Sequence, residues 1–130
     1  GLFTVDLAED EVIVGVQFAP VQSAAYAKLH QKASHYAIVG VAACLSVSGG
    51  TIQAARVALT GAGTHAQRMP EVEAALAGKP CNDATIASAA AVAGANLQDV
   101  NADIHASEAY RRAMVKVFTK RALQKAAARV

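Results

Sequence analysis

The chain has 130 residues, of which 54% are hydrophobic and 17% charged, and this composition indicates one globular domain with its own core rather than a disordered segment. Its formal net charge of +2 is too small to identify a partner. Two isolated cysteines, Cys44 and Cys81, exclude a disulfide framework, and the longest apolar run, residues 37–45, is less than half of a membrane span.

The first predicted strand covers residues 11–17, a short β-branched stretch that ends before Pro20, and we expect it at the edge of a sheet. A second strand is predicted over residues 24–32. Successive side chains of a strand point to opposite faces, so one of its faces is apolar and the other is aromatic and cationic. That second face carries Tyr26, Lys28, His30 and Lys32.

This aromatic and cationic face has two readings. Lysines are common on exposed sheet edges, where they discourage pairing with another chain. Alternatively, an aromatic ring and a cation two positions apart suit a planar anionic ligand such as a reduced flavin. Residue types alone favour the exposed edge.

A β-hairpin is predicted from two apolar runs, residues 36–47 and 51–60, because the glycine pair in "SGGT" between them suits a tight primed turn. Pairing Ser48 with Thr51 places residue 45 opposite 54 and residue 43 opposite 56. In this register, one face is small and apolar, so we expect a helix to cover it. That face carries Ile38, Gly40, Ala42 and Cys44 beside Ala55, Val57 and Leu59.

Three helices follow the strands. Pro70 and two acids in the first turn predict a short helix that ends at Gly78, and a second helix starts at Asn82 or Asp83 and ends near Gly94. The third helix starts at Ser107, and its apolar stripe is expected to contain Tyr110, Met114, Val117 and Phe118. Strands followed by helices predict an α+β fold, with three to four mostly antiparallel strands and three helices packed on one face.

Local motifs offer little catalytic chemistry. The glycines of "TGAGTHAQR" follow a strand of an antiparallel pair, so a turn is favoured over a phosphate loop. The four histidines lack metal-ligand spacing, and Ser34 and His35 are adjacent in sequence, with no orienting acid nearby. We therefore predict no catalytic residue and no metal site. The unpaired cysteines and the absence of a recognisable secretory leader favour a reduced, cytoplasmic setting.

The end of the chain is basic, because seven cations and no acid follow Glu108. This pattern is typical of a solvated helix face, although it would also suit an acidic protein partner. A nucleic-acid role is disfavoured, because no DNA-binding motif is present and few aromatic residues are interleaved for base stacking.

The sequence resembles the C-terminal domain of the flavin-binding medium subunit of molybdenum hydroxylases, with the aerobic carbon monoxide dehydrogenase members nearest and xanthine dehydrogenases more distant. The resemblance runs from about Phe3 to Leu123 and rests on four stretches in the family's order: "AYAKLHQKASHYAIVGVAA", "GGTIQAARVALTGAGTHAQR", "EVEAALAGKP" and "DIHASEAYRRAMVKVFTKRAL". The fold that it implies agrees with the fold predicted above.

The resemblance also implies a role in electron transfer from molybdenum through iron–sulfur clusters to FAD. In this family the C-terminal domain closes over the isoalloxazine ring. The "Y-x-K-x-x-x-K" stretch then places Tyr26 and Lys28 beside the ring, with Lys32 nearby, and His35 stands where the family often has an acid. Ser107 would cap the last helix and Arg111 would pair with Asp103.

The implied organisation is a single domain over 1–130. Residues 1–20 would form a strand that enters from a missing N-terminal FAD domain, 24–60 the sheet and 68–130 the helices. The N-terminal domain would hold most of the FAD. The expected partners are that domain, a molybdenum-binding large subunit and an iron–sulfur small subunit, with no nucleic acid and no membrane span. The alternative is a non-catalytic docking module that binds an acidic protein through the basic C-terminal helix.

Overall fold

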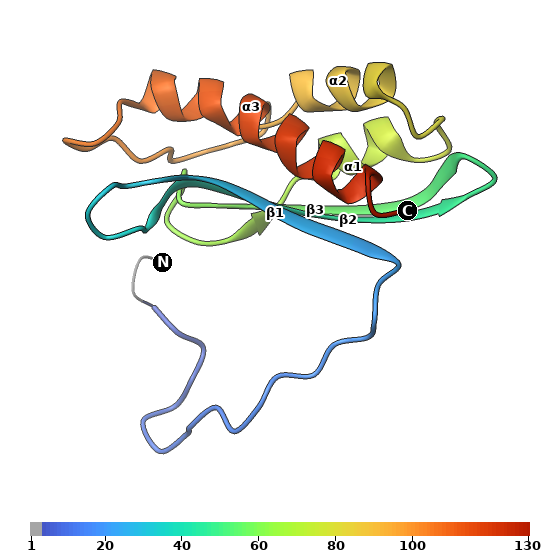
Figure 1. Cartoon of the computed structure of the whole chain (residues 1–130). Coiled ribbons are helices and arrows are strands. Elements are labelled where there is room, and N and C mark those ends of the chain that lie inside the picture. The colour runs from blue at the N-terminus through green and yellow to red at the C-terminus, as the bar shows by residue number, and fades with distance from the viewer. Residues whose placement is uncertain (1–3) are drawn as a thin grey trace.

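Four antiparallel strands form one sheet, and three helices cover one of its faces, in a computed structural model that describes residues 4–130 (Figure 1). The strands lie side by side in chain order as β1 (Ser23–His30), β2 (Ala37–Ser48), β3 (Thr51–Thr60) and β4 (Gln67–Arg68). The helices follow as α1 (Pro70–Leu76), α2 (Asp83–Ala91) and α3 (Glu108–Ala127). This arrangement confirms the predicted α+β fold.

The β2–β3 turn forms as predicted, but the register beyond it differs. Gly49 and Gly50 have φ of 56° and 74°, which a primed turn requires at both central positions. Ser48 pairs with Thr51, but an irregularity between Ser46 and Val47 then shifts the register by one residue. Leu45 therefore pairs with Ala55 rather than with residue 54.

This shift reverses the predicted faces of β2. A bulge adds one residue to one strand of a pair, so the side chains beyond it change partners. The helices cover the odd-numbered face of β2, whereas Ala42 and Cys44, which were expected under a helix, lie on the opposite face. Ile38, next to a second irregularity in the β1–β2 pairing, is half-buried and packs against the core. The covered side chains are Val39, Val41, Ala43 and Leu45 of β2 with Ala55, Val57 and Leu59 of β3.

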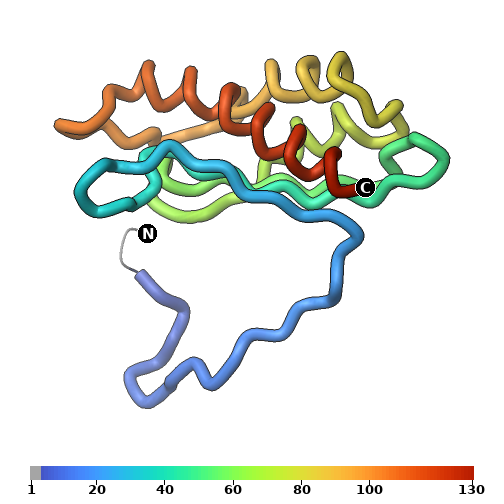
Figure 2. Tube along the Cα trace, in the orientation of Figure 1, coloured from blue at the N-terminus to red at the C-terminus, as the bar shows by residue number. Residues whose placement is uncertain are grey.

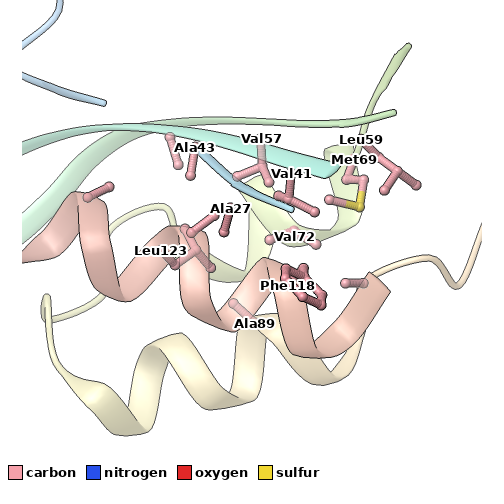
Figure 3. Close-up of a cluster of buried hydrophobic side chains, with 14 of the residues drawn as sticks. Ala27, Val41, Ala43, Val57, Leu59, Met69, Val72, Ala89, Phe118 and Leu123 are labelled. Atoms are coloured by element: carbon pink, nitrogen blue, oxygen red, sulfur yellow. The ribbon is translucent and has the colours of Figure 1, made fainter. Parts of the chain in front are cut away.

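The core lies between the sheet and the helices and is built from small and medium side chains (Figure 3). Ala27 of β1 and Val41 of β2 face Leu123 and Phe118 of α3, and Val72 of α1 packs beside them. Alanine at many contact positions brings α3 close to the sheet. The sheet is thereby covered on one side only.

Helix α3 begins where the sequence predicted, since Ser107 is its N-cap and the Ser107 hydroxyl accepts a hydrogen bond from the Tyr110 N–H at 3.3 Å. Its buried stripe differs from the prediction. Phe118 is buried, but Tyr110 and Val117 are 46% and 36% exposed, and Arg111 and Val115 take the inner positions instead. No described helix is long and apolar enough to cross a membrane.

Residues 4–22, here called the leading segment, form no strand or helix and run on the side of the sheet opposite the helices (Figure 2). The edge strand predicted over 11–17 is therefore wrong for the described part of the chain. The segment pairs with no described strand, and apolar side chains such as Val14 and Phe18 are 97% and 87% exposed. Residues 1–3, within the stretch expected to enter from another domain, lie outside the described residues.

Candidate functional site

The sheet face opposite the helices, here called the open face, has a floor of small side chains. Antiparallel pairing aligns its residues in rows across the strands: Lys28, Gly40 and Thr60; Tyr26, Ala42 and Ala58; Ala24, Cys44 and Arg56. Paired residues of neighbouring strands point to the same side of a sheet. The floor is therefore shallow along β2, and the larger side chains of these rows are Tyr26 and Lys28 of β1 and Arg56 of β3.

Tyr26 is the aromatic residue of this floor and is 48% exposed. Its ring does not stand upright, because the phenol end lies over Gly40 of the neighbouring strand. Ala25 and Ala27, on either side of it in β1, are buried against the helices. The alternation predicted for this strand is confirmed, and it places Tyr26 on the open face.

Lys28 lies on the same face but is held by the turn that follows β1. Its Nζ donates a hydrogen bond of 2.8 Å to the carbonyl oxygen of His35. An ammonium group has three donors, so this bond leaves donors for a ligand. Lys28 is thus both a charge on the open face and a tie to the β1–β2 turn.

Lys32 and His35 lie in that turn rather than on a strand. β1 ends at His30, two residues before the predicted end, so Lys32 does not continue the row of Tyr26 and Lys28. His35 has a φ of 59°, and its ring stacks on that of His30, with centroids 5.2 Å apart and planes within 4°. Lys28 and His30 of β1 thus meet the turn that carries Lys32 and His35.

Gln31 organises the same turn. Its side-chain oxygen accepts hydrogen bonds from the Ser34 N–H at 2.6 Å and the Ser34 hydroxyl at 3.0 Å, and its backbone N–H donates to the Tyr36 carbonyl at 2.9 Å. Sequence reasoning did not select Gln31. Its signal was a polar residue at the end of the otherwise apolar face of the predicted strand.

Beneath the turn lies a buried cation. The Arg111 guanidinium is 4% exposed and donates to the Ile38 carbonyl at 2.7 Å, to the Gly61 carbonyl at 3.2 Å and to Asp103 at 2.6 Å. The pairing with Asp103 that the family resemblance implied is confirmed. Arg111 ties α3 to the ends of β2 and β3.

Asp103 and Glu73 are the described acids whose pKa the fold lowers. The His105 and Ala106 N–H groups and the Arg111 guanidinium stabilise the Asp103 carboxylate and outweigh partial desolvation, so its pKa lies below the ordinary value. Burial alone would raise the pKa of Glu73, but hydrogen bonds from Arg68 and from the Val57 N–H lower it. Both acids support structure rather than the open face.

Two cavities flank the site. One, of about 250 Å³, lies between the β1–β2 turn and the loop before α3 and is lined by Gln31, Tyr36, Asn101 and Arg111 among others. Asn101 closes its floor with hydrogen bonds to the Gly61 and Gly63 carbonyls at 3.3 and 2.9 Å. The other, of about 290 Å³, lies where the leading segment meets the open face beside Cys44 and Arg56.

The open face fits the planar ring of a flavin better than a whole dinucleotide. Its shallow floor, the Tyr26 ring and the Lys28 cation can face a flat anionic ring system. The pyrophosphate would need backbone N–H groups at a glycine-rich helix start. The Gly61 and Gly63 carbonyls instead accept from Asn101, in a loop between antiparallel strands, and the described residues hold no group of three or more metal-binding side chains.

Comparison with known protein families then decides the identity of the domain. Residues 24–126 match the CO dehydrogenase flavoprotein C-terminal domain family. The chain belongs to this family. This confirms the resemblance on which the flavin interpretation of the open face was based, and the family is one of flavoprotein domains.

Curated relatives of the family domain are medium subunits of several enzymes. The nicotine 6-hydroxylase medium subunit of Paenarthrobacter nicotinovorans is 32% identical over 99% of this chain and 46% of the relative. The carbon monoxide dehydrogenase medium chain of Hydrogenophaga pseudoflava is 33% identical over the same shares. The chain therefore spans about half the length of the curated relatives it matches.

Solved structures of the family show the same fold. Carbon monoxide dehydrogenase from Hydrogenophaga pseudoflava, in a form lacking the Mo-pyranopterin moiety, matches with a TM-score of 0.77 and 37% identity, over 86% of this chain and 39% of that chain. Quinoline 2-oxidoreductase from Pseudomonas putida 86 matches with a TM-score of 0.76 and 31% identity, over 84% and 38%. The four-stranded sheet with three helices is the family fold.

Proposed function

We propose that the chain is the C-terminal domain of the flavoprotein medium subunit of a molybdenum hydroxylase, and that its open face closes over the isoalloxazine ring of FAD. The observation that carries this proposal is the helix-free face with Tyr26 and Lys28 on one strand, in a domain of this family. A preceding FAD domain would hold the rest of the cofactor. Molybdenum-binding large and iron–sulfur small subunits would be the partners.

Each candidate residue of the open face and its adjoining turn has a separate role in this proposal. Tyr26 limits access of solvent and oxidants to the ring, because its large side chain extends from β1 over the floor of the open face. Lys28 stabilises negative charge on the ring. Lys32 lies in the turn at the end of the face and adds positive charge near it, and His35 lies in the same turn. The bound flavin supplies the redox chemistry, and this chain supplies the protein surface that lies against its ring.

The proposal makes a prediction about the chain by itself. Since the pyrophosphate contacts are missing from the described fold, the isolated chain should bind FAD weakly and catalyse no reaction. The test is to purify the chain alone and together with the domain encoded directly upstream, and to record the flavin absorbance of each. Flavin should be retained only by the longer protein. Stoichiometric flavin on the chain alone would contradict the proposal.

Lys28→Met in the flavin-loaded subunit tests whether Lys28 stabilises negative charge on the flavin ring. Removing a cation near the ring should lower the flavin reduction potential by on the order of 30 mV, because one charge is worth about 1–2 kcal/mol at this range in a partly solvated site. Lys79→Met is the matched control, since Lys79 is exposed and follows α1, away from the open face. Equal potentials in the two variants would remove Lys28 from the site.

The outer face of α3 supports a second role in assembly. Lys116, Lys120, Arg121 and Lys125 are exposed along it. This surface suits an acidic partner protein. Lys116→Glu with Lys120→Glu should weaken association with the other subunits and leave the flavin spectrum unchanged. Normal assembly of this variant would show that the basic face is only solvated.

A further inference from the structure

Gly40 is buried although it lies on the open face of the sheet. Its row partners are Lys28 and Thr60, and no helix covers that side. The burial comes from Tyr26. A Cβ atom built on Gly40 would lie 2.1 Å from the Tyr26 hydroxyl oxygen and 2.9 Å from its Cζ. The phenol end of Tyr26 therefore occupies the space of the missing side chain.

The register explains how Tyr26 reaches this position. Tyr26 pairs with Ala42, so Gly40 is its diagonal neighbour on β2. Diagonal neighbours in an antiparallel sheet lie within reach of an aromatic side chain, and aromatic rings commonly cover a glycine in a strand. The third atom near the Gly40 position is Cγ2 of Thr60, at 3.1 Å. The ring thus reaches from β1 over β2, and Thr60 of β3 borders the same position from the other side.

We propose that Gly40 is a positioning residue that holds the Tyr26 ring down along the sheet, so that a planar ring system can lie over it. This inference rests on the proposed function and adds its geometric requirement. Any side chain at position 40 would lift the phenol end away from the sheet. A lifted ring would occupy the space above the alanine floor. With the Tyr26 phenol lying over Gly40, the open face can bind a flat, unbranched ring system against the phenol.

The unmodified protein allows a first test, by nuclear magnetic resonance. A ring lying over Gly40 shifts the resonances of its Hα protons upfield through the ring current. We expect that displacement in the wild-type chain and its loss in Tyr26→Leu. Undisplaced Hα resonances in the wild type would overturn the proposal, and this measurement requires no variant at Gly40.

A second test uses tyrosine fluorescence. The chain has no tryptophan and three tyrosines, so Tyr36→Phe with Tyr110→Phe leaves Tyr26 as the single reporter. Adding Gly40→Ala should increase the quenching of Tyr26 by acrylamide. Gly15→Ala is the matched control, because a Cβ there meets nothing within 4 Å and the backbone is not left-handed. Equal quenching in the two variants would contradict the proposal that Gly40 holds the Tyr26 ring against the sheet.

If Gly40→Ala fails to fold, Gly40→Ala with Tyr26→Leu should fold, because the obstructing phenol is gone. Failure of this double variant as well would show that Gly40 is required for another reason and would overturn the proposal.

In the flavin-loaded subunit, Gly40→Ala and Tyr26→Leu should change flavin fluorescence by similar amounts. The double variant should change it by no more than either single variant does. Additive changes would show that Gly40 does not act through Tyr26. If the subunit holds no flavin, the proposed function fails. The resonance and quenching results still decide whether Gly40 holds the Tyr26 ring against the sheet.

Discussion

Arg111 is a charge inside the fold whose partners come from three separate segments. Its guanidinium is 4% exposed and satisfies the Ile38 and Gly61 carbonyls as well as Asp103. Replacing it with methionine would preserve much of the packing but remove this donor from the Ile38 carbonyl and from one Asp103 oxygen, and leave the Gly61 carbonyl with Asn101 alone. We expect Arg111→Met to lower the free energy of unfolding by about 3 kcal/mol, measured by urea denaturation.

Arg112 provides the control for this substitution. It is the next residue on α3, but its side chain is 39% exposed. It forms an ion pair with Glu108 one helical turn away and donates a hydrogen bond of 3.3 Å to the Leu97 carbonyl. Surface ion pairs contribute little and a single hydrogen bond is worth about 1 kcal/mol, so Arg112→Met should cost clearly less than Arg111→Met. Similar losses for the two variants would mean that burial of Arg111 is not the source of its contribution.

Asp103 should make part of the stability depend on pH. The fold lowers its pKa, so the ionised carboxylate is favoured in the folded state. Its contribution is complete above the ordinary carboxyl pKa of about 4 and is lost as the pH falls through the lower folded value. Asp103→Asn should therefore be less stable than the wild type at pH 7, and the difference should disappear in acid.

Urea midpoints of the two proteins at neutral and acidic pH check this prediction. Asp10→Asn is a suitable control, because Asp10 lies in the exposed leading segment and should show no such difference. A gap between Asp103→Asn and the wild type that persists in strong acid would indicate lost packing or hydrogen bonding to the neutral group rather than lost ionisation.

At the scale of elements, two chain reversals depend on glycine for different reasons. Gly61, after β3, has a φ of 81°, and a Cβ there would lie 2.3 Å from the Ala37 carbonyl oxygen. Gly78, after α1, has a φ of 71° and open space around the same position. Gly78→Ala should cost about 1–2 kcal/mol from backbone conformation alone. Gly61→Ala should cost clearly more, because β2 must also move, and comparing thermal unfolding of the two variants isolates that crowding.

The sequence allowed the elements to be predicted but not every face of them. Alternation on β1 was correct because this strand pairs regularly up to Leu29. On β2 and β3 the turn and the covered face of β3 were also correct, but the register shift beside Val47 moved the covered side chains of β2 to the odd-numbered positions. The residue pattern of the two strands does not mark this bulge. Beside it, the Ile52 backbone exchanges hydrogen bonds with Lys79 and Gly78 of the loop after α1. On α3 the apolar pattern missed Arg111, whose burial depends on carbonyls 73 and 50 residues away.

The candidate site was predicted in part for the same reason. Tyr26 and Lys28 follow from the period of one strand, and the family resemblance gave that face a ligand. The Lys28 bond to the His35 carbonyl and the seat of Tyr26 on Gly40 involve residues of the next turn and strand. Contacts of this kind need the pairing of β1 with β2, which the residue pattern of either strand alone does not define.

For the whole molecule, most of the leading segment lies outside the sheet and the core. Its side chains are exposed and its backbone pairs with no described strand. Deleting residues 1–20 should change the free energy of unfolding by no more than about 0.5 kcal/mol. It should also reduce concentration-dependent association, because an exposed β-branched run readily pairs with other chains. Chemical denaturation and light scattering measure the two effects.

A slightly longer deletion provides the contrast. Gln22 donates a hydrogen bond to the Val47 carbonyl at 3.1 Å and accepts one from its N–H at 2.7 Å. Deleting residues 1–22 would leave the Val47 groups without these partners. This variant should therefore be measurably less stable than the one lacking 1–20. Equal stability would show that water replaces Gln22 without loss.

The closure of α3 onto β1 has a consequence for the time course of folding. The Ser23 hydroxyl donates to the Ala126 carbonyl at 2.5 Å, and Arg129 donates to the Ala24 carbonyl, so contacts between the two elements join positions more than 100 residues apart. The β2–β3 hairpin is local and can form within microseconds. On a ribosome that adds about 5–20 residues per second, β1 would wait roughly 5–20 s for its partner. Throughout that interval the strand carrying Tyr26 and Lys28 remains without the helix that covers its inner side.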